Sequence, residues 1–118
     1  MSDPNLPTVE DKIIETPWGS CIGHRVQWPG GQYCGLLTHR GIVGCGAYDV
    51  RCMEEFGMLV AIAKGTPAKP LMYAEDLLDA TIVDMTRQAA AAGIAKGMTG
   101  REALRVLLES APPAQQRI

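Results

Sequence analysis

Apolar and polar positions alternate along residues 20–28, with the period of two that is typical of a β-strand with one buried face. A Pro-Gly-Gly turn follows this segment directly, and further short apolar runs are bounded by glycine and turn residues. The first half of the chain is therefore predicted to form a sheet. Its strands are expected at residues 20–28, 32–38, 42–48 and 58–63, with a turn at 39–41 and a short helix at 50–56.

Helical spacing of apolar residues replaces this alternation in the second half. It predicts helices at residues 73–80 and 82–93. The clearest local signal is the sequence TGRE at residues 99–102, which matches a capping box with Thr99 as N-cap and Glu102 at the third helical position. A stripe of leucines continues from there into a final helix. Strands first and helices later favour an α+β domain.

Size and composition limit the classes of protein that fit. The chain has 118 residues, 47% of them hydrophobic, and a formal net charge of −2. Its cations are scattered, whereas nucleic-acid binding needs them clustered. No apolar run approaches the roughly 20 residues of a membrane helix, and the polar N-terminus is unlike a secretory signal. We therefore expect a cytoplasmic protein with no nucleic-acid or membrane partner, in which the four cysteines are thiols.

A single domain is expected, because the chain has no internal repeat and no linker long enough to divide it. The polar, proline-containing ends predict a flexible arm at residues 1–11 and a flexible tail at residues 111–118. Residues 12–110 are then the folded part. Glycine-rich strands in so small a domain have edges to protect, which predicts a homo-oligomer.

Two segments resemble motifs of the YunC-like family (domain of unknown function 1805), found in bacteria and archaea. Residues 41–50 (GIVGCGAYDV) are similar to the family's CGALD stretch, and residues 93–104 (GIAKGMTGREAL) to its GM-S/T-GREAL stretch. Residues 76–80 are similar to its central helix, so the resemblance covers residues 12–109. The chain departs from the pattern at Tyr48, where the family usually has leucine. The resemblance implies a small α+β domain with a mixed, mainly antiparallel sheet and self-association, and it implies no established reaction.

Cys45 is the first candidate functional residue. It lies between Gly44 and Gly46, and glycine within a strand often marks close approach by a ligand or another backbone. The thiol is a candidate nucleophile with His39 or His24 as its base. The alternative interpretation is a small buried thiol that packs against a helix.

A metal site depends on the register of the hairpin at residues 39–41. A two-residue loop places Cys34 opposite Cys45, whereas a three-residue loop places it opposite Gly46 and turns the two thiols to opposite faces. A three-residue loop with Gly41 in the left-handed position suits the sequence better. The cysteines Cys21 and Cys52 also lack the spacing of a zinc knuckle, so no metal is expected.

Three further features each have a structural and a functional interpretation. Asp49 is either the N-cap of the helix that follows or a ligand-binding carboxylate and orienter of a histidine base. His24, on an apolar strand face, is either a core histidine whose ring nitrogens have hydrogen-bond partners or a catalyst. The junction of Thr99, Gly100 and Arg101 is either a capped helix start or an anion seat made of backbone N–H groups and a cation.

These observations favour a binding role over catalysis, because no recognisable catalytic constellation is present. We expect a small oligomeric accessory protein that holds a small anionic or flavin-type ligand, such as flavin mononucleotide or a prenylated flavin, or a partner enzyme. The flavin version follows from a similarity of layout to the accessory proteins of flavin-dependent decarboxylases. The alternatives are a small enzyme with Cys45 as nucleophile and a structural subunit of a larger enzyme complex.

Overall fold

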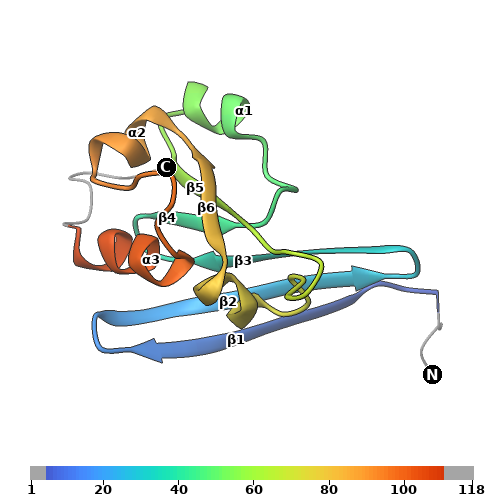
Figure 1. The fold of residues 1–118 in the computed structure, drawn as a ribbon. Coiled ribbons are helices and arrows are strands. Elements are labelled where there is room, and N and C mark those ends of the chain that lie inside the picture. The colour runs from blue at the N-terminus through green and yellow to red at the C-terminus, as the bar shows by residue number, and fades with distance from the viewer. Residues whose placement is uncertain (1–4, 111–118) are drawn as a thin grey trace.

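Short turns join the first four strands, so that neighbours in sequence are also neighbours in the sheet. The structure is a computed structural model, which describes residues 5–110. Over this range it forms one open sheet of six strands in the order β1-β2-β3-β4-β5-β6 (Figure 1). The strands are β1 (Thr8–Thr16), β2 (Gly19–Trp28), β3 (Gly31–Leu37), β4 (Gly41–Gly44), β5 (Leu59–Lys64) and β6 (Thr81–Met85).

All neighbouring strands are antiparallel except β4 and β5, which are parallel. A parallel pair needs a crossover, and helix α1 (Val50–Glu55) lies within it. The remaining helices are the 3-10 helix η1 (Ala74–Asp79), α2 (Arg87–Ala91) and α3 (Gly100–Glu109). The expected α+β domain with a mixed, mainly antiparallel sheet is thus confirmed.

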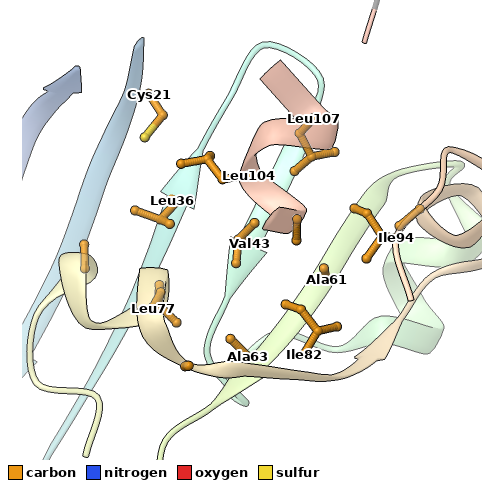
Figure 2. Packing of buried hydrophobic residues seen from close by; sticks show 14 of the residues in the cluster. Cys21, Leu36, Val43, Ala61, Ala63, Leu77, Ile82, Ile94, Leu104 and Leu107 are labelled. Carbon is orange, nitrogen blue, oxygen red and sulfur yellow. The ribbon is translucent and has the colours of Figure 1, made fainter. Parts of the chain in front are cut away.

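The core lies between one face of the sheet and the elements η1 and α3 (Figure 2). Alternate residues of the strands point into it, as the two-residue period of a strand requires. Gly100 begins α3 directly against η1, where a Cβ atom would overlap the carbonyl oxygen of Leu77. The residues that are fully buried in this cluster include Leu36, Val43, Ala61, Ala63, Leu77, Ala89, Ala103, Leu104 and Leu107.

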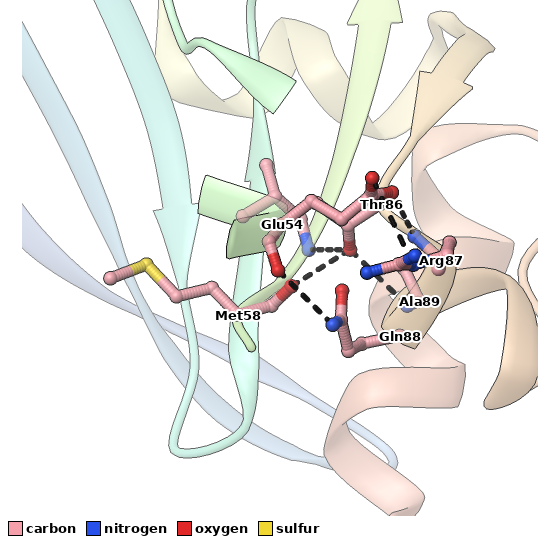
Figure 3. Close-up of polar contacts among 7 residues, drawn as sticks. Glu54, Met58, Thr86, Arg87, Gln88 and Ala89 are labelled. Carbon is pink, nitrogen blue, oxygen red and sulfur yellow. Dashed lines mark hydrogen bonds and ion pairs between the residues drawn. The ribbon is translucent and has the colours of Figure 1, made fainter. Parts of the chain in front are cut away.

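Thr86 links strand β5 to helix α2 (Figure 3). Its buried hydroxyl donates to the carbonyl oxygen of Met58 at 2.8 Å. The Thr86 hydroxyl oxygen also accepts the backbone N–H groups of Val60 at 3.2 Å and Ala89 at 3.3 Å. One side chain therefore satisfies polar groups of three segments and caps α2.

The opposite face of the sheet, which we call the open face, carries exposed apolar side chains over β1 and β2. Ile13 is 70% exposed and Ile22 is 44% exposed, and the two are paired across these strands. Val9 and Trp28 are also exposed on this face. The alternation predicted for residues 20–28 is confirmed, but the apolar face that includes Ile22 and His24 is the open face, and Cys21 is buried on the core face.

Three predictions of secondary structure were wrong. The strand expected at residues 42–48 ends at Gly44. Strand β1 begins at Thr8, so residues 8–11 are not part of a flexible arm; they pair with β2 from Gln27 to His24. The helix expected at residues 82–93 is a strand followed by a shorter helix, since β6 pairs with β5 and α2 begins only at Arg87. Tertiary pairing of a β-branched segment outweighs its helical spacing here. The predictions for residues 1–4 and 111–118 lie outside the described residues.

Among residues 5–110, no helix has the length and apolar character needed to cross a membrane.

Candidate functional site

The hairpin between β3 and β4 decides which residues meet. Leu37 pairs with Ile42 and Gly35 with Gly44, so the loop contains two residues and the predicted three-residue loop is wrong. The Thr38 hydroxyl explains the shorter loop, because it donates to the Gly41 carbonyl at 2.8 Å and accepts the Gly41 N–H at 2.9 Å. No left-handed glycine is then needed.

Gly41 has a different role from the predicted one. A Cβ atom there would overlap the carbonyl oxygen of Leu59 on the parallel strand β5. The glycine therefore permits the close approach of β4 and β5, rather than a left-handed turn.

This register places Cys34 directly opposite Cys45, just beyond the end of β4. The Cys45 N–H donates to the Cys34 carbonyl at 3.1 Å. The Cys34 N–H donates to the sulfur of Cys45 at 3.5 Å, where a regular ladder would offer it a carbonyl. Cys34 is buried in the core, whereas Cys45 is half-buried at its border. The structure thus places one accessible thiol beside one inaccessible thiol.

The surroundings of the two cysteines shift the pKa values of their thiols in opposite directions. The hydrogen bond from the Cys34 thiol lowers the pKa of Cys45 to about 5, against the opposing effect of burial. The backbone N–H groups of Cys34 and Ala47 act in the same direction on this pKa. Two causes raise the pKa of Cys34: its hydrogen bond to Cys45 is the larger, and burial is the second. Both shifts favour a protonated Cys34 beside a Cys45 thiolate, and a thiolate is the reactive form of cysteine.

Tyr48 lies on the other side of this strand pair. Its ring covers Gly35 and Gly44, where added Cβ atoms would lie 2.6 Å from its Oη and Cε2 atoms, respectively. It also makes an edge contact with Tyr33, with ring centroids 6.3 Å apart. Burial raises the pKa of Tyr48 to about 12, so the hydroxyl stays protonated. Tyr48 thus fills space over two glycines on the open face.

Gly46 is not crowded. A Cβ atom at this position would meet no atom within 4 Å. Of the two glycines beside Cys45, only Gly44 makes the close approach that was expected of both.

The histidines lie elsewhere. His24 Nδ1 contacts the Asp11 carboxylate at 2.5 Å on the open face, so it is a satisfied histidine but not a core one. His39 Nε2 contacts the Ser110 carbonyl at 3.2 Å. Asp49 accepts the Cys52 N–H at 3.1 Å as the N-cap of α1. The structure does not assemble these groups with Cys45 into the predicted nucleophile, base and orienter.

The residue that the structure adds to the candidate site is Cys34, which from the sequence was considered only as a metal ligand. The signal was present in the two-residue hairpin alternative, in which Cys34 faces Cys45. No cluster of three or more His, Cys, Asp or Glu side chains able to hold a metal occurs among residues 5–110.

The start of α3 uses most of its donors internally. The Gly100 N–H donates to the Ala80 carbonyl at 2.8 Å, and the Thr99 N–H to the Glu102 carboxylate at 3.0 Å. The Glu102 N–H donates to the Thr99 hydroxyl at 3.1 Å, which confirms the capping box. Arg101 contacts Asp79 at 3.5 Å. These bonds favour the capped helix start over the anion seat.

A cavity of about 350 Å³ opens near this junction, between the loop after β5 and η1. Lys64 and Lys69 line it, together with Asp76 and Asp79. Asp76 accepts two backbone N–H groups, and Asp79 contacts Arg101. The lining thus carries two lysines and two aspartates, and both carboxylates already have partners within the protein.

Comparisons with known proteins agree with the fold. The family model described as a domain of unknown function (DUF1805) matches residues 44–107, which confirms the YunC-like resemblance. The crystal structure of TA1206 from Thermoplasma acidophilum, a protein of unknown function, is similar with a TM-score of 0.74 and 19% identity. The similarity covers 86% of this chain and 94% of that one. No curated protein matches the sequence.

Proposed function

Because this chain belongs to the DUF1805 family, whose description assigns no function, we propose from its own geometry that it is a small thiol protein acting through the Cys45 thiolate. One observation carries the proposal. The half-buried Cys45 sulfur accepts the N–H of Cys34 at 3.5 Å and lies beside the Cys34 thiol, which keeps the shared proton. A thiolate that is both stabilised and accessible is a nucleophile for small electrophiles.

The other cysteines lack this combination. Cys21 is buried, and burial raises its pKa. Cys34 is buried and holds its proton. Cys52 is exposed on α1, and its backbone N–H is bound by the Asp49 carboxylate. Selective reaction at Cys45 is therefore the distinguishing expectation.

The test is alkylation of the native protein with limiting iodoacetamide near pH 6, followed by peptide mass mapping. Cys45 is expected to carry most of the label, and Cys52 supplies the internal comparison because it is more exposed. Cys45→Ser should remove this label, and Cys52→Ser should leave it unchanged. Label on Cys52 with Cys45 unmodified would overturn the proposal.

The cavity beside η1 supports a second proposed function, that of an accessory protein that holds an anionic ligand at Lys64 and Lys69. Its volume of about 350 Å³ lies at the small end of ligand pockets. Lys64 and Lys69 would pair with a phosphate or carboxylate of the ligand, flavin mononucleotide included. The ligand would be held for a partner enzyme in the cytoplasm.

Calorimetry with inorganic phosphate and with oxidised and reduced flavin mononucleotide tests this second function. Lys64→Gln with Lys69→Gln should abolish binding, and Lys96→Gln, which lies outside the cavity lining, should not. Heat of binding that is unaffected by the double substitution would rule out this cavity as the site.

Self-association is part of the same proposal. The apolar open face over β1 and β2, with Ile13 70% exposed, supports a contact between copies, since large bare apolar patches are uncommon. Sedimentation at micromolar concentration should show an oligomer that Ile13→Glu dissociates. A monomer before substitution would contradict it.

A further inference from the structure

Cys34 and Cys45 are placed where a disulfide can form. Residues directly opposite in an antiparallel pair have Cα atoms about 4.5–5.5 Å apart. Disulfides span Cα separations of about 4.4–6.8 Å. The Cys45 N–H is bonded to the Cys34 carbonyl at 3.1 Å, so the two residues hold this opposite placement. A bond between their sulfurs requires no movement of the strands past each other.

No other cysteine among residues 5–110 competes for this partner. Cys34 pairs with Arg25 across β2 and β3, and Cys21 is four residues farther along β2. At about 3.3 Å per residue, that is about 13 Å along the strand. Cys52 lies on α1, beyond the turn that follows Cys45.

Access and charge set an order of reaction for the two thiols. Cys34 is 2% exposed, so a solute in solution reaches only Cys45. While Cys45 is a thiolate, its hydrogen bond and charge raise the pKa of Cys34. Neutralisation of Cys45 by chemical reaction removes that charge and makes the Cys34 proton easier to lose. The inner thiol thus becomes competent only after the outer one has reacted.

We propose that Cys45 and Cys34 form a dithiol that reduces hydroperoxides, with Cys45 as the attacking thiol and Cys34 as the resolving thiol. This inference rests on the proposed function of Cys45 and adds the class of substrate and the second residue.

In the first step, the Cys45 thiolate attacks an oxygen of the hydroperoxide. A sulfur–oxygen bond forms, the oxygen–oxygen bond breaks, and the departing oxygen takes a proton from solvent to leave as an alcohol or water. Cys45 is oxidised to a sulfenic acid. In the second step, Cys34 gives up its proton and its sulfur attacks that of Cys45. The sulfur–sulfur bond forms, the sulfur–oxygen bond breaks, and hydroxide leaves with the proton as water.

The experiment adds hydrogen peroxide, and in a second arm tert-butyl hydroperoxide, to the reduced full-length protein. The intact mass should fall by two hydrogen atoms, and peptide mapping should show a Cys34–Cys45 bridge that dithiothreitol reverses. Reaction in both arms indicates a general hydroperoxide site, and reaction with hydrogen peroxide alone restricts the substrate to the smaller molecule.

Three variants make the assignment specific. Cys34→Ser should stop at the sulfenic acid of Cys45, which dimedone traps. Cys45→Ser should lose both the bridge and the dimedone adduct, and Cys52→Ser should behave as the unmodified protein. A Cys45 that alkylates rapidly but yields no bridge with either peroxide overturns this inference and leaves the proposed function standing. Failure of alkylation as well overturns both.

Discussion

The ring of Tyr48 occupies the space that a side chain at Gly44 would need. An added Cβ atom would lie 2.6 Å from Cε2 of the ring, and the paired Gly35 is covered by the same tyrosine. Because Tyr48 follows Cys45 by three residues, this contact holds the turn that presents the sulfur. The Tyr48 N–H closes that turn on the Cys45 carbonyl at 3.4 Å.

Gly44→Ala is therefore expected to destabilise the protein by about 1–3 kcal/mol, the usual cost of overpacking. Gly46→Ala is the matched control, since its Cβ would meet no atom within 4 Å, and it should change the free energy of unfolding by less than about 0.5 kcal/mol. Urea denaturation of the two variants measures the difference. Equal stabilities would show that the Tyr48 ring moves away without cost.

The rate of Cys45 alkylation should depend on pH in a range unusual for a thiol. With a pKa of about 5, Cys45 is already a thiolate at pH 7, and its rate should fall only as the pH drops through about 5. A free thiol has a pKa of about 8.5, so its alkylation rate already falls as the pH drops through about 8.5. Stopped-flow alkylation with free cysteine as reference measures both profiles. Coincident profiles would contradict the assignment.

The same thiolate links stability to pH. The folded pKa of Cys45 lies below the ordinary thiol value, so its contribution to stability is fully present above that ordinary value and is lost as the pH falls toward 5. Cys45→Ser should remove this part of the pH dependence, whereas Cys52→Ser should keep it. Denaturation midpoints from pH 5 to pH 9 test the prediction, and identical pH slopes for the two variants would refute it.

Cys34→Ala should move the alkylation midpoint of Cys45 to higher pH. Hydrogen bonds to charged groups contribute about 1.5–3 kcal/mol, which corresponds to about one to two pH units. Cys21→Ala removes another buried thiol from the core face and controls for the cavity. A midpoint that shifts equally in both variants would assign the effect to packing rather than to the Cys34 thiol.

Thr86→Ala should cost more stability than Thr99→Ala. The Thr99 cap at the exposed start of α3 accounts for about 1 kcal/mol. The Thr86 hydroxyl is fully buried, and its loss leaves the Val60 and Ala89 N–H groups without their acceptor, at about 1–3 kcal/mol for a buried unsatisfied group. Thermal denaturation compares the two, with Thr86→Ser expected to retain most of the stability. Comparable losses for Thr86→Ser and Thr86→Ala would show that the methyl group, not the hydroxyl, matters.

The sequence by itself determined the features that depend on near neighbours. The alternation over residues 20–28 and the capping box of Thr99 and Glu102 are confirmed because each rests on contacts within a few residues. Asp49 likewise caps α1, as local spacing indicated. These features follow from strand and helix periods and from side chains that reach their own backbone.

Only the tertiary structure decided the features that depend on distant partners. Residues 82–85 became a strand because β5 was beside them, and residues 8–11 became one because β2 was. The candidate site differs most from its prediction, because a shift of one residue in strand register turns every side chain to the other face of the sheet. The Thr38 hydroxyl favours the two-residue loop, and that loop places Cys34 against Cys45. The cysteine pair is thus a consequence of strand pairing, which the local pattern of residues does not specify.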